Sequence, residues 1–430
     1  MVESVHLFVL SVLVFGFGLL SRRFARGVLT GPLAFVVFGL LLSPAFCAWA
    51  GLGQLFGELE GAEETIHLLG EITLTIVLFT DAAQIRLATL RRGARIPIRL
   101  LLIGMPLTIL LGAGLAFPLF GELGVFELLL LATMLAPTDA ALGQAVVTSD
   151  RVPVRIRQGL SVESGLNDGI AVPFVIVFGS FASLGGGNPG ESVSLAECAG
   201  VAVQALTLGP LAGVVVGGAG AWLMTHAIRR GWMEHAYQEL AGIVVGNSTK
   251  EVGRGLYDFA EAEAQLLMLV TFFMVGLVLA FEPLTQAGPE AWIYAVLSLT
   301  VVRMLPVALS LVGLGLRPVT LAFVGWFGPR GLASVLFAVL VIEDLPVPHA
   351  DDIVQVVLLT VLLSVVAHGM TAAPFSNRYA RALERFRRER DGETAAEHRD
   401  CPAGLVRDRA LDTAIESMSG RVDASRDGTS

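Results

Sequence analysis

The chain has 430 residues, of which 54% are hydrophobic and 16% are charged, with a formal net charge of -9 and a mean hydropathy of +0.72. Soluble globular domains carry about 25% charged residues, so this composition excludes an ordinary soluble protein and indicates a polytopic membrane protein. The three cysteines are widely spaced and form no CxxC pair, which argues against a disulfide framework or a structural zinc site.

The apolar runs of the sequence predict transmembrane helices, because a helix crosses a bilayer with roughly 17 to 25 apolar residues. Such runs cover residues 5–20, 28–47, 66–85, 97–119, 123–147, 158–184, 196–227, 264–281, 291–313, 319–342 and 353–373. The first run is followed, not preceded, by arginines, so we interpret it as a span and not as a signal peptide. We therefore predict an all-α membrane protein with about 11 transmembrane helices.

Charged residues in the predicted loops alternate in sign along the chain. Arginine-rich loops near residues 22–26, 86–99, 151–157 and 229–230 alternate with acidic loops. We expect a multi-pass protein of the plasma (inner) membrane, and because positive loops stay on the cytoplasmic side, the loop charges set its orientation. Its N-terminus should lie outside and its C-terminus in the cytoplasm.

Two regions depart from this regular pattern. The segment 232–263 must be cytoplasmic at both ends, and its one apolar run is too short to cross a membrane, so no span is predicted there. Residues 376–430 are rich in Arg, Asp, Glu and Ser. We expect them to form a charged cytoplasmic tail, disordered beyond a short basic helix next to the membrane.

A polar cluster interrupts the apolar span at 158–184. On a helix, Ser164 and Asp168 are four residues apart, as are Glu163 and Asn167, so one strip presents hydroxyl, amide and carboxylate oxygens. A charged side chain in mid-membrane costs about 2.5 to 3.5 kcal/mol. Oxygen ligands suit hard cations, and a buried carboxyl could hold either a proton or a cation. The alternative is a hydrogen-bonded patch that joins helices.

Two further polar interruptions lie in predicted spans. Pro137 removes a helix N–H beside Thr138 and Asp139, which frees carbonyl groups that could bind a cation. Asp139 could bind through water, pair with an arginine or cap the following half-helix, and a simple proline kink is the alternative for the whole stretch. Residues 325–331 contain Gly and Pro around Arg330, which we expect to compensate carboxylates. A broken helix in each half of a membrane protein indicates an inverted-repeat transporter.

Two other polar side chains lie in the predicted spans of the second half. Arg303 should pair with an acid or extend to the membrane interface, and we favour a pair with Glu163. His368 is near the end of the last span, where a packing or interface role is more common than a proton relay.

Common enzyme and nucleotide motifs are missing from the sequence. There is no GxxxxGK[ST], GxSxG or HExxH motif, which argues against an ATP-driven pump, a lipase-like enzyme or a membrane zinc protease. Nucleic-acid-binding motifs are also missing. We expect neither enzymatic activity nor a cofactor, and no nucleic-acid partner; the expected partners are membrane lipid, protons and cations.

The motifs at 136–139, 163–168 and 328–331 together resemble those of NhaP-type sodium/proton antiporters of the monovalent cation:proton antiporter superfamily. The resemblance covers roughly residues 5–375 and implies an inverted-repeat fold with two broken crossing helices. It implies that Asp168 carries the cation and the proton in alternation, that Ser164 and the Thr138 carbonyl are ligands of a monovalent metal cation, and that Glu163 supports the site. Asn167, where electrogenic relatives have a second Asp, is similar to the electroneutral branch.

The resemblance also implies a division of the transmembrane domain at 1–375. A core of helices at 97–184 and 291–373 should move, as an elevator, against dimerisation helices at 5–85 and 264–281 in a homodimer. This sequence departs from the family at Ala140, where many relatives have Pro, and around 232–263, where the family generally has two more spans. A transport-inactive homologue that acts as a membrane scaffold or sensor is therefore the main alternative, and a channel is a weaker one.

Overall fold

The computed structural model describes residues 11–12, 14–19, 30–50, 68–69, 72–73, 75–76, 95–139, 142–147, 149, 151–185, 195–230, 232 and 254–400. Every structural statement below concerns these residues. They divide between two units, residues 1–380 and residues 381–430, and the features discussed below lie in the first unit.

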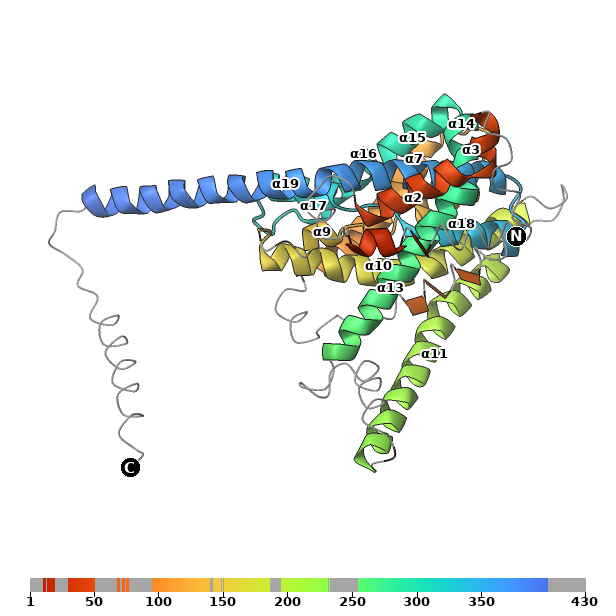
Figure 1. Cartoon of the computed structure of the whole chain (residues 1–430), viewed down its shortest axis with the longest axis horizontal. Coiled ribbons are helices and arrows are strands. Elements are labelled where there is room, and N and C mark those ends of the chain that lie inside the picture. The colour runs from red at the N-terminus through yellow and green to blue at the C-terminus, as the bar shows by residue number, and fades with distance from the viewer. Residues whose placement is uncertain are drawn as a thin grey trace. The chain divides into compact units, whose positions relative to one another are not determined.

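All regular elements in the described residues are helices, labelled in Figure 1. In chain order they are α2 (Gly31–Leu42), α3 (Pro44–Trp49), α6 (Arg95–Arg99), η1 (Leu100–Gly104), α7 (Met105–Ala116), α8 (Val125–Met134), α9 (Gln144–Val147), α10 (Val154–Gly185), α11 (Leu195–Arg229), α13 (Arg254–Met274), η2 (Val275–Leu279), α14 (Phe281–Gln286), α15 (Pro289–Leu299), α16 (Val301–Ser310), α17 (Pro318–Trp326), α18 (Leu332–Asp344) and α19 (Ala350–Asp400).

Several of these helices coincide with predicted spans. Four segments of the described chain are both long and apolar enough to cross a membrane: Arg95–Ala116, Val154–Ser183, Pro289–Ser310 and Ala350–Phe386. Shorter apolar helices include α2, α8 and α18. Half of the predicted span at 5–20 and most of the one at 66–85 lie outside the described residues, as does most of 232–263, so the total of eleven stays a prediction.

Two of the helical spans are broken where proline and glycine predicted it. The first interruption separates α8 from α9 between Met134 and Gln144, and the second separates α17 from α18 between Trp326 and Leu332. A third interruption, at Thr300 between α15 and α16, was not predicted. The Thr300 hydroxyl bonds back to the Val296 carbonyl at 2.6 Å, a contact that bends helices without Gly or Pro.

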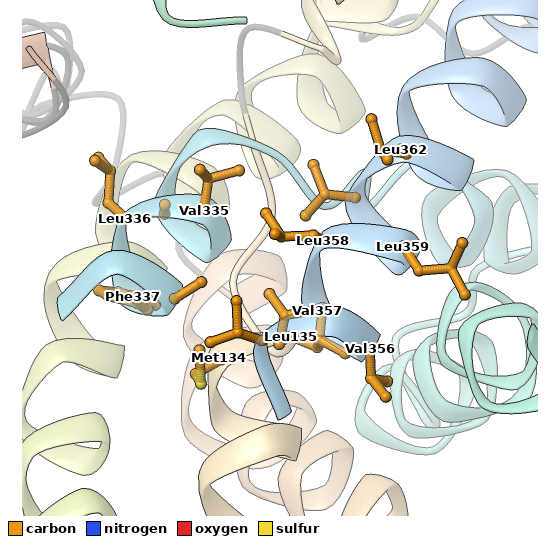
Figure 2. Close-up of a cluster of buried hydrophobic side chains, with 14 of the residues drawn as sticks. Met134, Leu135, Val335, Leu336, Phe337, Val356, Val357, Leu358, Leu359 and Leu362 are labelled. Carbon is orange, nitrogen blue, oxygen red and sulfur yellow. The ribbon is translucent and has the colours of Figure 1, made fainter. Parts of the chain in front are cut away.

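A hydrophobic cluster holds the two interruptions against the last long helix (Figure 2). It is built from the end of α8, the first turns of α18 and the N-terminal part of α19, with Met134, Leu135, Val335, Leu336, Phe337, Val356, Val357, Leu358, Leu359 and Leu362 among its members. All of these side chains are buried. The apolar packing therefore brings both broken segments and α19 together.

Two helices extend further than the apolar runs predict. α13 begins at Arg254, ten residues before the predicted span at 264–281, and α19 continues to Asp400, beyond the span at 353–373. The apolar run marks only the part of a helix that lipid or protein must cover, whereas backbone hydrogen bonding continues into polar sequence. The tail beyond Asp400, expected to be disordered, lies outside the described residues.

α2 crosses α13 and η2 at a contact between two glycines (Figure 1). A methyl group on Gly39 would overlap the carbonyl oxygen of Phe273, and one on Gly276 would overlap the carbonyl oxygen of Val36. Small residues allow membrane helices to approach this closely, because lipid supplies no hydrophobic drive between helices. This contact joins two helices of the predicted dimerisation part.

We expect Gly39→Ala to lower the free energy of unfolding by about 1 to 3 kcal/mol, because the added methyl overlaps backbone that cannot move aside. The measurement is the thermal midpoint of the protein in detergent. Gly114→Ala is the matched control: a Cβ there meets no described atom within 4 Å, so the variant should be as stable as wild type or slightly more stable. Equal midpoints for wild type and Gly39→Ala would contradict the contact.

Candidate functional site

The polar strip of α10 is buried in the described structure. Glu163, Ser164, Asn167 and Asp168 are exposed by 2%, 8%, 2% and 6% respectively, although all are polar or charged. They lie in the middle of a helix of 32 residues, whose i, i+4 spacing puts Ser164 one turn before Asp168. The structure therefore places the predicted carrier and its neighbours on one buried part of α10.

Thr138, in the first interruption, contacts this strip directly. Its Oγ1 lies 3.0 Å from the Ser164 hydroxyl and accepts a hydrogen bond of 2.7 Å from the Asn167 side-chain amide. An aspartate at 167 would be an acceptor when ionised and could not donate to Thr138. Asn167 is thus more than a neutral neighbour of Asp168, because it fixes the threonine of the facing segment.

Asp139 caps helices in both interrupted spans. Its Oδ1 accepts from the backbone N–H of Leu142 at 3.2 Å, and its Oδ2 accepts from the N–H of Leu332, the first residue of α18, at 2.8 Å. A carboxylate at a helix N-terminus satisfies free donors and opposes the positive end of the helix dipole. Of the three roles considered for Asp139, the bond from Leu142 agrees with capping of the segment that follows it, and the cap on α18 is an addition.

The two interruptions also touch through their backbones. The N–H of Asp139 donates to the Pro329 carbonyl at 2.8 Å. A Cβ on Gly331 would overlap the Asp139 carboxylate, so only glycine leaves room for it at that position. Irregular backbone within a membrane needs such partners, because lipid offers none.

Arg330 holds the first interruption from the second. Its side chain is fully buried, and Nη1 donates to the carbonyls of Ala136 at 2.5 Å and Pro137 at 3.0 Å. We expected it to compensate carboxylates; its hydrogen bonds go instead to carbonyls that Pro137 frees from the helix, although it also interacts electrostatically with Glu163. Because guanidinium is planar and always charged, it suits two neighbouring carbonyl acceptors.

Arg303 of α16 forms the expected ion pair with Glu163. The Nη1–Oε1 distance is 2.7 Å, and both side chains are buried, with 4% and 3% exposed. A Cβ on Gly328 would overlap the Arg303 guanidinium, so this glycine provides the path along which the arginine reaches α10. Three residues of the 328–331 motif therefore have separate roles. Gly328 leaves room for the Arg303 side chain, Arg330 binds carbonyl groups, and Gly331 leaves room for the Asp139 carboxylate.

Three polar contacts near the interruptions were not predicted. Ser334 of α18 donates to the Met134 carbonyl at 2.7 Å, which satisfies the end of α8. Ser364 and His368 of α19 contact backbone groups at the second interruption. The only sequence signal for them is that each is a polar residue within a predicted span, and that signal does not identify a partner.

The geometry can be compared with known proteins. Residues 9–235 and 239–378 match the family described as "Sodium/hydrogen exchanger, transmembrane". Three curated relatives are similar to this chain. A Na(+)/H(+) antiporter of Schizosaccharomyces pombe is 36% identical over 107 residues, which are 24% of this chain and 23% of that protein. The other two relatives match over most of this chain.

The Na(+)/H(+) antiporter ApNhaP of Aphanothece halophytica is 23% identical, over 87% of this chain and 78% of its own length. The K(+)/H(+) antiporter NhaP of Alkalimonas amylolytica is 25% identical, over 83% of this chain and 63% of its own length. The matched part of this chain thus spans less than two thirds of the length of two of these three relatives.

A solved structure has a similar fold. The sodium proton antiporter MjNhaP1 of Methanocaldococcus jannaschii superposes with a TM-score of 0.65 at 19% sequence identity, covering 88% of this chain and all of that one. At this identity the likeness concerns the fold. The all-helical arrangement of the described residues is therefore the arrangement of a known membrane antiporter.

Proposed function

Because this chain belongs to the transmembrane sodium/hydrogen exchanger family, with NhaP-type antiporters among its relatives, we propose that it exchanges a monovalent cation for a proton across the membrane. Na⁺ and K⁺ are the proposed cations, since both appear in the names of its relatives. Asp168 binds the cation and the proton in alternation, Ser164 and the Thr138 carbonyl complete the cation ligands, and Asn167 positions Thr138.

The balance of buried charge is the observation that carries this proposal. Apart from Glu127, which contacts His349, the buried carboxylates of the described residues are Glu163, Asp139 and Asp168, and they lie in the protein with two buried guanidinium groups, Arg303 and Arg330. Glu163 is paired with Arg303, and Asp139 accepts hydrogen bonds from the backbone N–H groups of Leu142 and Leu332, so both have structural roles. Together these three carboxylates and two guanidinium groups carry one negative charge in excess, and a single proton or a single monovalent cation on Asp168 balances it.

Neutralisation explains how exchange is coupled. Moving an uncompensated charge through a membrane-embedded core is costly, so the site crosses only when a proton or a cation occupies Asp168. One ion of either kind gives the same net charge, which makes a one-for-one, electroneutral exchange the natural stoichiometry. The neutral Asn167 is consistent with it, because an aspartate at this position would add a second charge that requires its own ion.

The proposed movement is an elevator motion of the core at 97–184 and 291–373 against the helices at 5–85 and 264–281, in a homodimer. Every residue assigned to the site belongs to the core ranges, so the site moves as one body. The Gly39–Gly276 contact, by contrast, joins α2 to η2 within the other part. We place the protein in the plasma (inner) membrane with its N-terminus outside and its C-terminus in the cytoplasm.

Proteoliposomes with an internal pH dye test the function. After a pH gradient is imposed, addition of Na⁺ or K⁺ should dissipate it, and a membrane potential set with an ionophore should leave the rate unchanged. Li⁺ serves as a third cation. The proposal fails if none of the three cations dissipates the gradient, and electroneutrality fails if the rate follows the potential.

The transport-inactive scaffold or sensor has less support, because the named relatives are antiporters and the hydroxyl, amide and carboxylate groups of the site are all in place. This alternative would gain support if the native chain is folded but exchanges no ions in the same assay, and becomes active after two helices of a relative are inserted at residue 240. A channel would differ from both by conducting ions without moving protons.

A further inference from the structure

Hydrogen bonds connect α19 to the second interruption. Ser364 Oγ accepts from the backbone N–H of Arg330 at 2.7 Å. His368, one turn later on α19, lies with Nε2 2.9 Å from the Trp326 carbonyl, at the end of α17. Both α19 side chains are buried, with exposures of 0% and 1%. The cation site described above makes no use of either residue.

The hydrogen-bonding groups around His368 show which imidazole nitrogen donates to the second interruption. The Trp326 carbonyl can only accept, so Nε2 carries the proton and donates to it. Nδ1 lies 3.1 Å from Ser364 Oγ and 3.0 Å from the Ser364 carbonyl, so it can accept from the hydroxyl or donate to the carbonyl. Ser364 Oγ also accepts the Arg330 N–H. In either case His368 donates from Nε2 to the residue before the break, and Ser364 holds Arg330 within it.

The imidazole is also fixed in orientation. The Trp326 ring lies 5.1 Å from the His368 ring, and the Trp326 indole N–H donates to Thr371 Oγ1 at 2.9 Å. The ring contact and the hydrogen bonds of both imidazole nitrogens hold the His368 ring in place. Its contacts with the interruption are to backbone, at the residue before the break and, through Ser364, at Arg330 within it.

These contacts form a continuous path to the cation site. Ser364 holds the backbone of Arg330, whose guanidinium holds the carbonyls of Ala136 and Pro137, and Thr138 follows directly in the chain. We propose that Ser364 and His368 are positioning residues for the cation site: they set where Arg330 places the first interruption and hence the geometry of the Thr138 ligand. This inference rests on the proposed antiport function.

A purely structural role would make a different prediction from a positioning role. Loss of a packing contact lowers the amount of folded protein and scales the rate at every cation concentration. Loss of a positioning contact weakens cation binding while the occupied site still crosses at a normal rate. Residues that orient the ligands of a metal typically change affinity by about 10- to 100-fold when they are replaced. A variant that changes the half-saturating cation concentration but not the maximal transport rate therefore indicates a positioning role.

The experiment measures Na⁺-driven proton efflux from proteoliposomes, per reconstituted protein, over a range of Na⁺ concentrations. Ser364→Ala should raise the half-saturating Na⁺ concentration about tenfold and keep the maximal rate within about twofold of wild type. His368→Leu should do the same. His368→Gln, whose side-chain amide can still donate near the position of Nε2, should return most of the affinity.

One variant on the same helix serves as a control. Thr360→Val removes a buried hydroxyl whose hydrogen bond goes to the Val356 carbonyl of its own helix. It should keep the wild-type half-saturating Na⁺ concentration. The inference is overturned if Ser364→Ala keeps the wild-type half-saturation, or if Thr360→Val raises it equally. If the wild type itself exchanges no cation, the proposed function fails, and this inference with it.

Discussion

Asp168→Asn should lower cation-dependent proton movement in proteoliposomes by at least about 100-fold, while the protein stays folded. Asparagine has nearly the shape of aspartate but neither titrates nor supplies a negative charge, so it cannot exchange a proton for a cation. Because the remaining buried charges of the cluster balance without Asp168, the variant should be at least as stable as wild type. Transport with the pH dye and the thermal midpoint in detergent measure the two effects.

Thr133→Val is the matched control, because it tests whether a change in the broken helix is enough by itself to reduce transport. Thr133 is buried on α8, five residues before Thr138, and its hydroxyl bonds the Leu129 carbonyl of its own helix. This variant should transport like wild type. An Asp168→Asn protein that still exchanges cations for protons at the wild-type rate would show that another group carries the ions.

Arg303→Met should lower the free energy of unfolding by about 3 to 5 kcal/mol, because it leaves the Glu163 carboxylate buried without its ion-pair partner. The double variant Arg303→Met with Glu163→Gln removes both charges and should regain most of that loss. A buried pair replaced as a whole is often close to neutral in stability, whereas a single buried charge is not. Reversible unfolding in mixed micelles gives the free energies of the four proteins.

The four proteins form a double-mutant cycle, in which the coupling term isolates the interaction of the two side chains. We expect a coupling of at least about 2 kcal/mol, since residues in contact couple by 0.5 to 3 kcal/mol and this pair is buried. If the single losses simply add in the double variant, Arg303 and Glu163 do not stabilise each other.

The sequence predicts the interruptions well because proline and glycine act on the local backbone. Pro137 cannot donate in a helix, and the glycines around Pro329 weaken the second span, so both breaks follow from residue type alone. The pairing of Arg303 with Glu163 could also be predicted, since a guanidinium within a span needs an acid and few acids are available there.

Other features depend on tertiary contacts that residue types do not reveal. Arg330 could equally have faced a carboxylate, and only the fold places the Ala136 and Pro137 carbonyls within its reach. The break at Thr300 occurs without Gly or Pro. For His368, the sequence favours a packing role, and its hydrogen bond to the Trp326 carbonyl depends on how α17 and α19 meet.

The central claim is that one carboxyl, Asp168, binds either a proton or a cation, and the pH dependence of cation affinity tests it most directly. If both ions compete for one site, the half-saturating Na⁺ concentration rises as pH falls, by about tenfold per pH unit once the free site is mostly protonated, while the maximal rate at saturating Na⁺ stays constant. A half-saturating Na⁺ concentration that stays the same across the pH range in which exchange occurs would contradict the account.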